Sequence, residues 1–207
     1  MTTNPKFIVI EGGDGTGKST QVARLAERLQ NEGHDVITTR CPGATPVGER
    51  IRDLLLSSDE PMDPMTEAAL HFAANNQLVQ QVVMPAIKAG KVVITDRYVQ
   101  STWAYQVAGQ RMPSTVFLQL MEAFAKNNGH YHVPTHTIIL DAPVQVTMAR
   151  LGGTNRYECQ NEAFFERVRN GYRNIPTRWL KTDIVDANQP VDAVANDIYR
   201  RLCPSLR

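Results

Sequence analysis

One stretch near the start of the 207-residue chain sets its architecture: Phe7-Ile8-Val9-Ile10-Glu11-Gly12-Gly13-Asp14-Gly15-Thr16-Gly17-Lys18-Ser19-Thr20. Its first four residues are apolar and mostly β-branched, which is typical of a buried strand. From Lys18 onward, apolar residues recur at helical spacing, at Val22, Leu25, Ala26 and Leu29. A strand, a glycine-rich loop and a helix therefore follow one another. This order brings the loop's backbone N–H groups to the positive end of the helix dipole, where phosphate binds.

The alternation of strands and helices continues along the chain. Strand-like runs lie at residues 36–39, 92–95, 137–140 and, more weakly, 183–185. One predicted helix begins at Pro46, a residue that suits the first helical position, and another runs from about Asp63 to Met84. These patterns predict a doubly wound α/β fold with a five-stranded parallel sheet flanked by helices. No linker divides the chain, so we expect a single domain over residues 1–207, with ligands at the carboxyl ends of the strands.

The glycine-rich loop fits the P-loop motif G-x-x-x-x-G-K-[ST] in full, between a strand and a helix. It predicts a P-loop NTPase in which Lys18 reaches the β and γ phosphates of ATP and the Ser19 hydroxyl binds Mg²⁺. The expected ATP-binding residues are Gly12, Gly13, Asp14, Gly15, Thr16, Gly17, Lys18, Ser19 and Thr20. The chain has no N-K-x-D tetrapeptide for guanine, and helicases and translocases are usually larger and more basic. A small kinase is therefore favoured.

The composition narrows the class of protein. Apolar residues make up 42% of the chain and charged residues 21%, as in ordinary globular proteins. Lys and Arg number 22 against 21 Asp and Glu, and this balance argues against a broad surface for nucleic acid or membranes. The three cysteines are scattered, and the apolar run after the polar N-terminus is too short for a signal or a membrane span. These features predict a cytoplasmic protein.

Charged residues follow two of the predicted strands. Asp96 and Arg97 come directly after the run at 92–95, and Arg40 follows the run at 36–39. An aspartate at a strand end opposite a P-loop is suited to Mg²⁺, and an arginine can grip a phosphate with two parallel hydrogen bonds. Because the carboxyl ends of parallel strands share one edge of the sheet, the two arginines should converge there. They suit a second anionic substrate.

Six segments together make the chain resemble the thymidylate kinases. They are Glu11 to Thr20, Thr39-Arg40-x-Pro42-Gly43, Asp96-Arg97-Tyr98, Ser101-Thr102-x-Ala104-Tyr105-Gln106, Arg156-x-Glu158 and Asp186-Ala187. Only the first is highly specific alone, but all six occur in the order and spacing of the family. The resemblance implies a nucleoside monophosphate kinase that transfers the γ-phosphoryl group of ATP to dTMP with Mg²⁺, in dTTP synthesis. It also implies a homodimer.

The resemblance also assigns roles around the acceptor nucleotide. Asp14 would face the sugar near its 3′-hydroxyl, and Arg97 with Arg40 would hold the acceptor phosphate. The remaining dTMP-binding residues are expected to be Thr102 at the thymine edge, Tyr105 against the 2′ position, Gln106 beside the base or sugar, and Phe72 stacked on the ring. Lys18, Arg97, Arg156 and Asp14 form the expected catalytic set, and Ser19 and Asp96 the metal site.

The P-loop itself carries no arginine, so the chain resembles the bacterial type, which keeps its basic residues in a lid. The lid is expected at about residues 150–160, where Arg150 and Arg156 are the only cations between Arg150 and Tyr157. Arg156 would stabilise charge on the transferring group, and Arg150 would contact ATP. We expect Arg156→Ala to lower kcat more than acceptor affinity.

Several residues depart from the family pattern. The arginine expected four residues after the stacking phenylalanine is Asn76 here, or Asn75 if His71 takes the aromatic position instead. The preferred base is therefore open: dUMP or a 5-substituted dUMP is the alternative acceptor, and a non-catalytic nucleotide-binding switch is a second alternative. Cys41 stands where the family has an acidic residue, and we expect a packed thiol. His130, His132 and His136 are expected in a surface loop rather than in a metal site.

Overall fold

The computed structural model describes residues 6–57, 61–127, 130–131, 133–152, 155–176 and 182–206. Its main sheet contains β1 (Phe7–Gly12), β2 (Val36–Arg40), β3 (Val92–Asp96), β6 (His136–Asp141) and β7 (Thr182–Asp186). These five strands are all parallel, in the order β2-β3-β1-β6-β7. The doubly wound α/β prediction is therefore confirmed, and each predicted strand run lies within a strand of the sheet.

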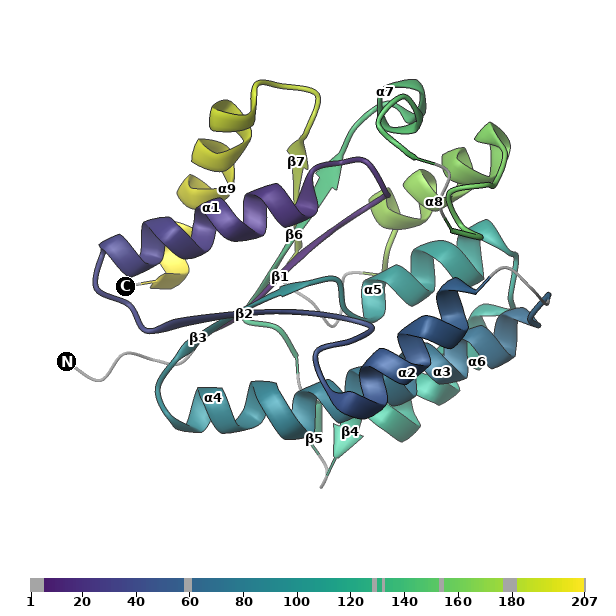
Figure 1. Ribbon diagram of the computed structural model, residues 1–207, viewed down its shortest axis with the longest axis horizontal. Helices are drawn as coiled ribbons and strands as arrows, with labels where there is room; N and C mark the ends of the chain where they lie inside the picture. The colour runs from purple at the N-terminus through teal and green to yellow at the C-terminus, as the bar shows by residue number, and fades with distance from the viewer. Residues whose placement is uncertain are drawn as a thin grey trace.

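Helices cover both faces of the sheet (Figure 1). The α-helices are α1 (Lys18–Asn31), α2 (Pro46–Leu56), α3 (Pro64–Leu78), α4 (Met84–Lys88), α5 (Val99–Thr102), α6 (Ser114–Leu120), α7 (Val144–Met148), α8 (Glu162–Arg173) and α9 (Val191–Leu206). Wider π-helical turns form η1 (Val79–Val83), η2 (Trp103–Gly109) and η3 (Met121–Ala125). Among the described residues, no helix is long and apolar enough to cross a membrane.

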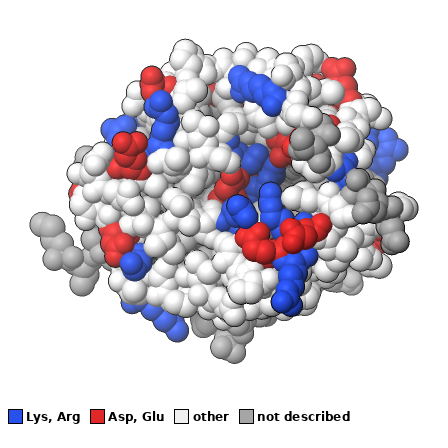
Figure 2. Space-filling model, viewed as in Figure 1, with Lys and Arg blue, Asp and Glu red and all other residues white. Residues whose placement is uncertain are grey.

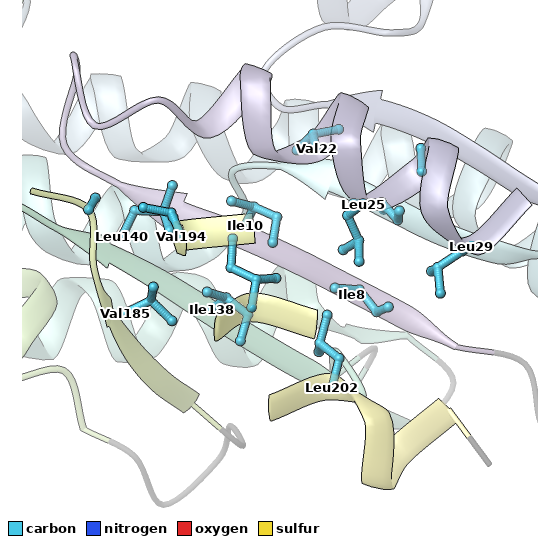
Figure 3. Close-up of a cluster of buried hydrophobic side chains, with 14 of the residues drawn as sticks. Ile8, Ile10, Val22, Leu25, Leu29, Ile138, Leu140, Val185, Val194 and Leu202 are labelled. Atoms are coloured by element: carbon cyan, nitrogen blue, oxygen red, sulfur yellow. The ribbon is translucent and has the colours of Figure 1, made fainter. Parts of the chain in front are cut away.

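The alternation of side chains along β1 divides the core between the two faces. Ile8 and Ile10 point toward α1 and α9, where they pack with Leu25, Leu29 and Leu202 (Figure 3). Phe7 and Val9 point the other way, into a cluster formed mainly by α3, η1 and α5. A third cluster joins η2 to α8. Because β1 lies in the middle of the sheet, its carboxyl end and the loop that follows are held from both sides.

Local capping signals fix the helix boundaries. Pro46 is the first residue of α2, and the preceding Thr45 accepts a hydrogen bond from the backbone N–H of Gly48. Asp63 caps α3 in the same way, through the backbone N–H of Met65. The helix predicted from Asp63 to Met84 is observed as α3, η1 and α4, which continue one another to Lys88. It therefore ends four residues later than expected.

Two features differ from the sequence-based expectation. The short strands β4 (Lys126–Asn127) and β5 (His130–Tyr131) form an antiparallel pair that no sequence signal indicated. His136 was expected in a surface loop, but that prediction is wrong: it begins β6, is buried, and its imidazole Nε2 bonds the carboxylate of Asp183 on β7. A buried polar group is stable when it is hydrogen-bonded. His132 lies outside the described residues.

Candidate active site

The loop between β1 and α1 has the shape that its glycines permit. Gly12, Gly15 and Gly17 have positive φ angles of 140°, 79° and 89°, which other residues adopt only with strain. A Cβ at Gly12 would lie 2.5 Å from the carbonyl oxygen of Leu140, so the close approach of the loop to β6 requires glycine there. No side chain among those described caps the start of α1. Its first N–H groups are thus available to a phosphate.

Lys18 and Asp14 lie inside this loop and influence each other's charge. The Lys18 Nζ atom donates to the carbonyl oxygen of Gly13 at 2.9 Å and lies 3.9 Å from Asp14 Oδ1. Burial and the nearby Arg97 lower the pKa of Lys18 to about 8, and Asp14 opposes that shift. Burial alone would raise the pKa of Asp14, but Arg97 and Lys18 hold it at about 2. The loop thus pairs an ionised carboxylate with a lysine that titrates near neutral pH.

Ser19 and Asp96, the two residues predicted for the metal site, lie in contact. The Ser19 hydroxyl donates to Asp96 Oδ2 at 2.8 Å, and the buried Asp96 Oδ1 has no hydrogen-bond partner among the described residues. A hydroxyl and a carboxylate are the hard oxygen ligands that a divalent cation such as Mg²⁺ takes beside phosphates. The residues present therefore fit a metal ion. Within the described part of the chain, no group of three or more His, Cys, Asp or Glu side chains forms another candidate metal site.

A hollow opens beside the P-loop, in the face where basic and acidic side chains gather in Figure 2. Its wall includes Lys18, Ser19, Thr20, Arg40, Arg52, Asp96, Arg97, Arg150 and Glu158. Arg150 donates to the carbonyl oxygen of Gly15 at 3.1 Å, so the start of the segment expected to form a lid contacts the P-loop. Arg40 is exposed, and its Nη2 atom donates to both carboxylate oxygens of Glu49, at 2.9 and 3.0 Å. Cys41 is buried, and burial raises the pKa of its thiol.

Arg97 is held by more partners than any other cation described near the loop. Its backbone is left-handed, with φ of 71°, which aims the side chain back across the end of β1. The guanidinium pairs with the carboxylate of Asp14. It also donates to Gly12 O at 3.2 Å, Ser101 Oγ at 2.9 Å, Tyr172 Oη at 2.9 Å and Tyr105 Oη at 3.4 Å. This arrangement fixes a buried positive charge between β1, η2 and α8.

A second cavity adjoins the P-loop hollow. It is lined by Asp14, Pro42, Arg52, Leu55, Leu56, His71, Arg97, Ser101, Tyr105, Gln106, Asn155, Tyr157 and Glu158. Asp14, Arg52, Arg97 and Glu158 belong to both walls, so the two spaces meet at a charged boundary. Tyr105 donates to Asp14 Oδ2 at 2.7 Å, which ties the second cavity to the P-loop. The combination of apolar, aromatic and polar side chains suits a nucleoside.

Four predicted dTMP-binding residues do not line this cavity: Arg40 lines only the P-loop hollow, and Phe72, Asn76 and Thr102 line neither space. Phe72 is 1% exposed and packs against Phe117 and Phe124, with ring centroids at 5.5 and 6.2 Å. Asn76 lies beside a separate small cavity that Phe72 also lines. Thr102 is buried, and its hydroxyl has no partner among the described residues. The structure therefore places the phenylalanine in the core, one residue out of register with the cavity.

His71, the alternative that the sequence left open for the aromatic position, lines the cavity wall, and Phe72 does not. Burial lowers the pKa of His71 to about 3, and the nearby Arg97, Arg52 and Arg156 lower it further. The ring is thus a neutral imidazole at physiological pH. Arg52 was also missed; it lines both spaces and donates to the carbonyl oxygen of Pro42 at 3.2 Å. The sequence did carry one signal for Arg52. This residue lies in the helix predicted to begin at Pro46, next to the strand edge where ligands were expected.

A buried carboxylate organises the far side of the cavity. Glu67 on α3 is 0% exposed and pairs with Arg156 from the lid segment. It accepts further hydrogen bonds from Gln106 Nε2 at 3.0 Å, Gln110 Nε2 at 2.9 Å and Tyr157 Oη at 2.9 Å. Arg156 is therefore absent from the wall of the P-loop hollow and faces α3 instead. Of the two predicted lid arginines, the structure brings only Arg150 to the P-loop.

A second buried carboxylate, that of Glu11, connects the elements that surround the P-loop. Glu11, at the end of β1, is 0% exposed and accepts from Tyr98 N at 2.7 Å and Ser101 Oγ at 2.7 Å. It also accepts from the Tyr172 hydroxyl at 3.1 Å. Burial raises its pKa, against the opposing effect of Arg97. Glu11 thereby fixes α5 and α8 relative to the P-loop.

Comparison with known proteins agrees with this geometry. A family model described as "Thymidylate kinase" matches residues 10–198. The thymidylate kinase of Caulobacter vibrioides is 42% identical over 193 residues, which is 91% of each chain. That of Ectopseudomonas mendocina is 43% identical over 208 residues, covering 97% of this chain and 95% of the relative. That of Pseudomonas putida strain W619 is 42% identical over 200 residues, or 93% of each chain. The chain belongs to the thymidylate kinase family.

Proposed function

We propose that this protein transfers the γ-phosphoryl group of ATP to dTMP, giving dTDP. The observation that carries the proposal is the boundary shared by the P-loop hollow and the second cavity, formed by Asp14, Arg52, Arg97 and Glu158. Two nucleotides bound in these spaces would meet with their phosphates at this boundary. Phosphoryl transfer depends mainly on aligning two polyanions and screening their charge, and the boundary supplies two arginines for that purpose.

The donor side follows from the P-loop geometry. Lys18 and Arg150 would contact the ATP phosphates, since both line the P-loop hollow, and the backbone from Gly12 to Gly17 would provide N–H donors. Mg²⁺ would be held by Ser19 and Asp96, and when bound it would screen the charge of the phosphates. The chain's own residues align the donor, because the P-loop is anchored to β6 at Gly12 and to the lid at Gly15.

The acceptor side needs no general base. A phosphate monoester has a second pKa of about 6, so it is already an anion at neutral pH. Arg97 and Arg52 are placed to hold this phosphate, with the exposed Arg40 at the rim of the hollow. Asp14 and Tyr105 would contact the sugar. We assign the position against the base to His71 in place of Phe72, because His71 lines the cavity and Phe72 does not.

Several wider features are proposals from the family. We propose that the protein is a homodimer, acts in the synthesis of dTTP and resides in the cytoplasm. Size-exclusion chromatography with light scattering tests the dimer directly, since a single peak at the mass of one chain would contradict it. The near-balance of charge, with 22 basic and 21 acidic residues, supports a small-molecule enzyme over a nucleic-acid-binding protein.

The proposed function is tested by an ATP-consumption assay across the nucleoside monophosphates. We expect dTMP to be phosphorylated with the highest kcat/KM among the natural nucleotides. Loss of turnover with dTMP would overturn the proposal. Lys18→Ala, which removes the phosphate-binding cation of the P-loop, is the matched inactive variant: it should lose kcat while dTMP still binds.

A second candidate is a kinase for dUMP or a 5-substituted dUMP. It is favoured by the asparagines Asn75 and Asn76 on α3, which leave no arginine at the base-contact position of the family pattern. Both asparagines line the separate small cavity and not the acceptor cavity. This candidate requires a 5-substituted analogue to match or exceed dTMP in kcat/KM. A non-catalytic switch would instead respond to ATP alone, and competitive binding of dTMP without ATP would exclude it.

A further inference from the structure

Tyr172 on α8 lies behind the acceptor cavity, where its hydroxyl contacts Arg97. The Tyr172 side chain is 2% exposed and lines the small cavity that the P-loop forms with β6, α7 and α8. It lines neither the acceptor cavity nor the P-loop hollow, whereas Arg97 lines both. Arg97 Nη1 donates to Tyr172 Oη at 2.9 Å. Tyr172 would therefore act on a bound nucleotide only through its neighbours, and Arg97 is the charged one.

The Tyr172 hydroxyl belongs to a buried triangle with Glu11 and Ser101. Tyr172 Oη lies 3.1 Å from Glu11 Oε2 and 2.9 Å from Ser101 Oγ. Ser101 Oγ also donates to Glu11 Oε2, at 2.7 Å. The backbone N–H groups of Tyr98 and Ser101 donate to the other carboxylate oxygen, Oε1, at 2.7 and 3.1 Å. Four donors thus surround a completely buried carboxylate, as its ionised form requires.

The ionised carboxylate fixes the direction of the hydrogen bonds in this triangle. It only accepts, and each hydroxyl has a single proton to give. The Ser101 proton goes to Glu11, and the Tyr172 proton goes to Glu11 or to Ser101 Oγ. Both hydroxyls therefore keep lone pairs for Arg97 Nη1, which donates to each of them at 2.9 Å. With Gly12 O at 3.2 Å, Nη1 has three acceptors among the described residues.

Holding Nη1 in this way orients the other end of the guanidinium. Arg97 Nη2 pairs with the Asp14 carboxylate and lies 3.4 Å from Tyr105 Oη. Asp14 and Tyr105 both line the acceptor cavity. Because the guanidinium is planar and rigid, fixing the position of Nη1 also fixes the direction of Nη2. The triangle therefore directs Nη2 toward the boundary between the two spaces.

We propose that Tyr172 is a positioning residue for the acceptor phosphate, because its hydroxyl, oriented by Glu11 and Ser101, holds Arg97 with Nη2 toward that phosphate. This inference rests on the proposed function, in which Arg97 binds the phosphate of dTMP. The hydroxyl can be removed without removing the ring. The Tyr172 ring packs edge-to-face against Tyr105, with centroids 6.4 Å apart, and a phenylalanine keeps this contact.

The test compares Tyr172→Phe with Tyr199→Phe as the matched control. Tyr199 lies on α9, against the core cluster on the other face of the sheet. Calorimetric titration without ATP gives Kd for dTMP and for thymidine, which has the same base and sugar but no phosphate. One hydrogen bond to a charged group corresponds to a change of roughly 10-fold. We expect Tyr172→Phe to raise the Kd for dTMP by this factor, with unchanged Kd for thymidine and unchanged KM for ATP. Tyr199→Phe should leave all three values unchanged.

Two further variants test the path through Arg97. Added to Arg97→Ala, Tyr172→Phe should weaken dTMP binding no further, because the two residues act together. Glu11→Gln keeps the shape of the carboxylate but adds an amide donor, which competes for the hydroxyl lone pairs. It should weaken dTMP and spare thymidine, and it tests the same arrangement if Tyr172→Phe fails to fold.

Equal weakening of dTMP and thymidine by Tyr172→Phe would overturn the inference, because it would show a general loss of structure. A further loss of dTMP affinity in the double variant would overturn it as well. If wild-type protein binds dTMP without phosphorylating it, the proposed function fails, and the ratio of the two Kd values still decides the role of Tyr172. If wild-type protein is active and Tyr172→Phe keeps its Kd for dTMP, only this inference fails.

Discussion

Removing Arg97 should destabilise the protein far more than removing Arg40, although the sequence assigns both to the acceptor phosphate. Breaking a buried ion pair by deleting one partner costs about 3–5 kcal/mol. Here Asp14 keeps 26% of its side-chain exposure and still has Lys18 at 3.9 Å, so we expect the lower end, about 3 kcal/mol, for Arg97→Ala. Arg40 and Glu49 are 54% and 41% exposed, and such pairs contribute less than about 1 kcal/mol.

Urea unfolding of the nucleotide-free protein measures this difference. With a slope of about 2–3 kcal/mol per molar, a loss of 3 kcal/mol lowers the midpoint by about 1 M or more. Arg40→Ala should shift it by less than about 0.5 M. Calorimetric titration with dTMP should show weaker binding for both variants. Midpoints that fall equally for the two variants would refute the reasoning, since it depends on the burial of Arg97 and the exposure of Arg40.

Three further predictions follow from the site and its supports. Lys18 has a pKa of about 8, so it loses its positive charge as the pH rises above this value, and kcat/KM for ATP should fall above about pH 8. A pH-rate profile measures this fall, and a profile that stays flat to pH 10 would contradict the role of Lys18. The folded-state pKa of His71, about 3, lies below its usual value, so its contribution to stability is full above about pH 6.5 and declines toward pH 3. His71→Phe should flatten this part of the pH dependence of the unfolding midpoint, and an unchanged slope would argue against a buried neutral imidazole. A Cβ at Gly171 would lie 2.6 Å from the Cβ of Ala108, so Gly171→Ala should cost about 1–3 kcal/mol in thermal unfolding, and an unchanged melting temperature would show that α8 can shift away from η2.

The sequence was sufficient for features that depend on neighbouring residues. The P-loop, the five parallel strands and the start of α2 at Pro46 each follow from a run of adjacent residues, and all were predicted. Ser19 and Asp96 were predicted to share a metal site, because the carboxyl ends of parallel strands meet at one edge of the sheet, and the two side chains do lie in contact. Local pattern and sheet topology together therefore locate the phosphate side of the site.

The base side of the cavity could not be predicted in the same way. Neighbouring residues of a helix point about 100° apart, so a one-residue error in the orientation of α3 exchanged His71 for Phe72. Phe72 is the larger apolar residue, and it is the one that is buried in the core. The contact between Glu67 and Arg156 joins residues 89 positions apart, and no local pattern indicates it. The same holds for His136, which is buried because Asp183 on the adjacent strand accepts its hydrogen bond.

The pairing of Asp14 with Arg97 has a consequence for turnover. This carboxylate pairs with a guanidinium that the acceptor phosphate would also need. With Arg97 as the proposed phosphate ligand, an incoming phosphate would compete with Asp14, and part of its binding free energy would be used to displace the carboxylate. The same competition would act on the diphosphate product if Arg97 holds its phosphate as proposed. Weaker ground-state binding of substrate and product would favour a higher kcat over a higher affinity. This is an advantage when the concentration of the acceptor is high.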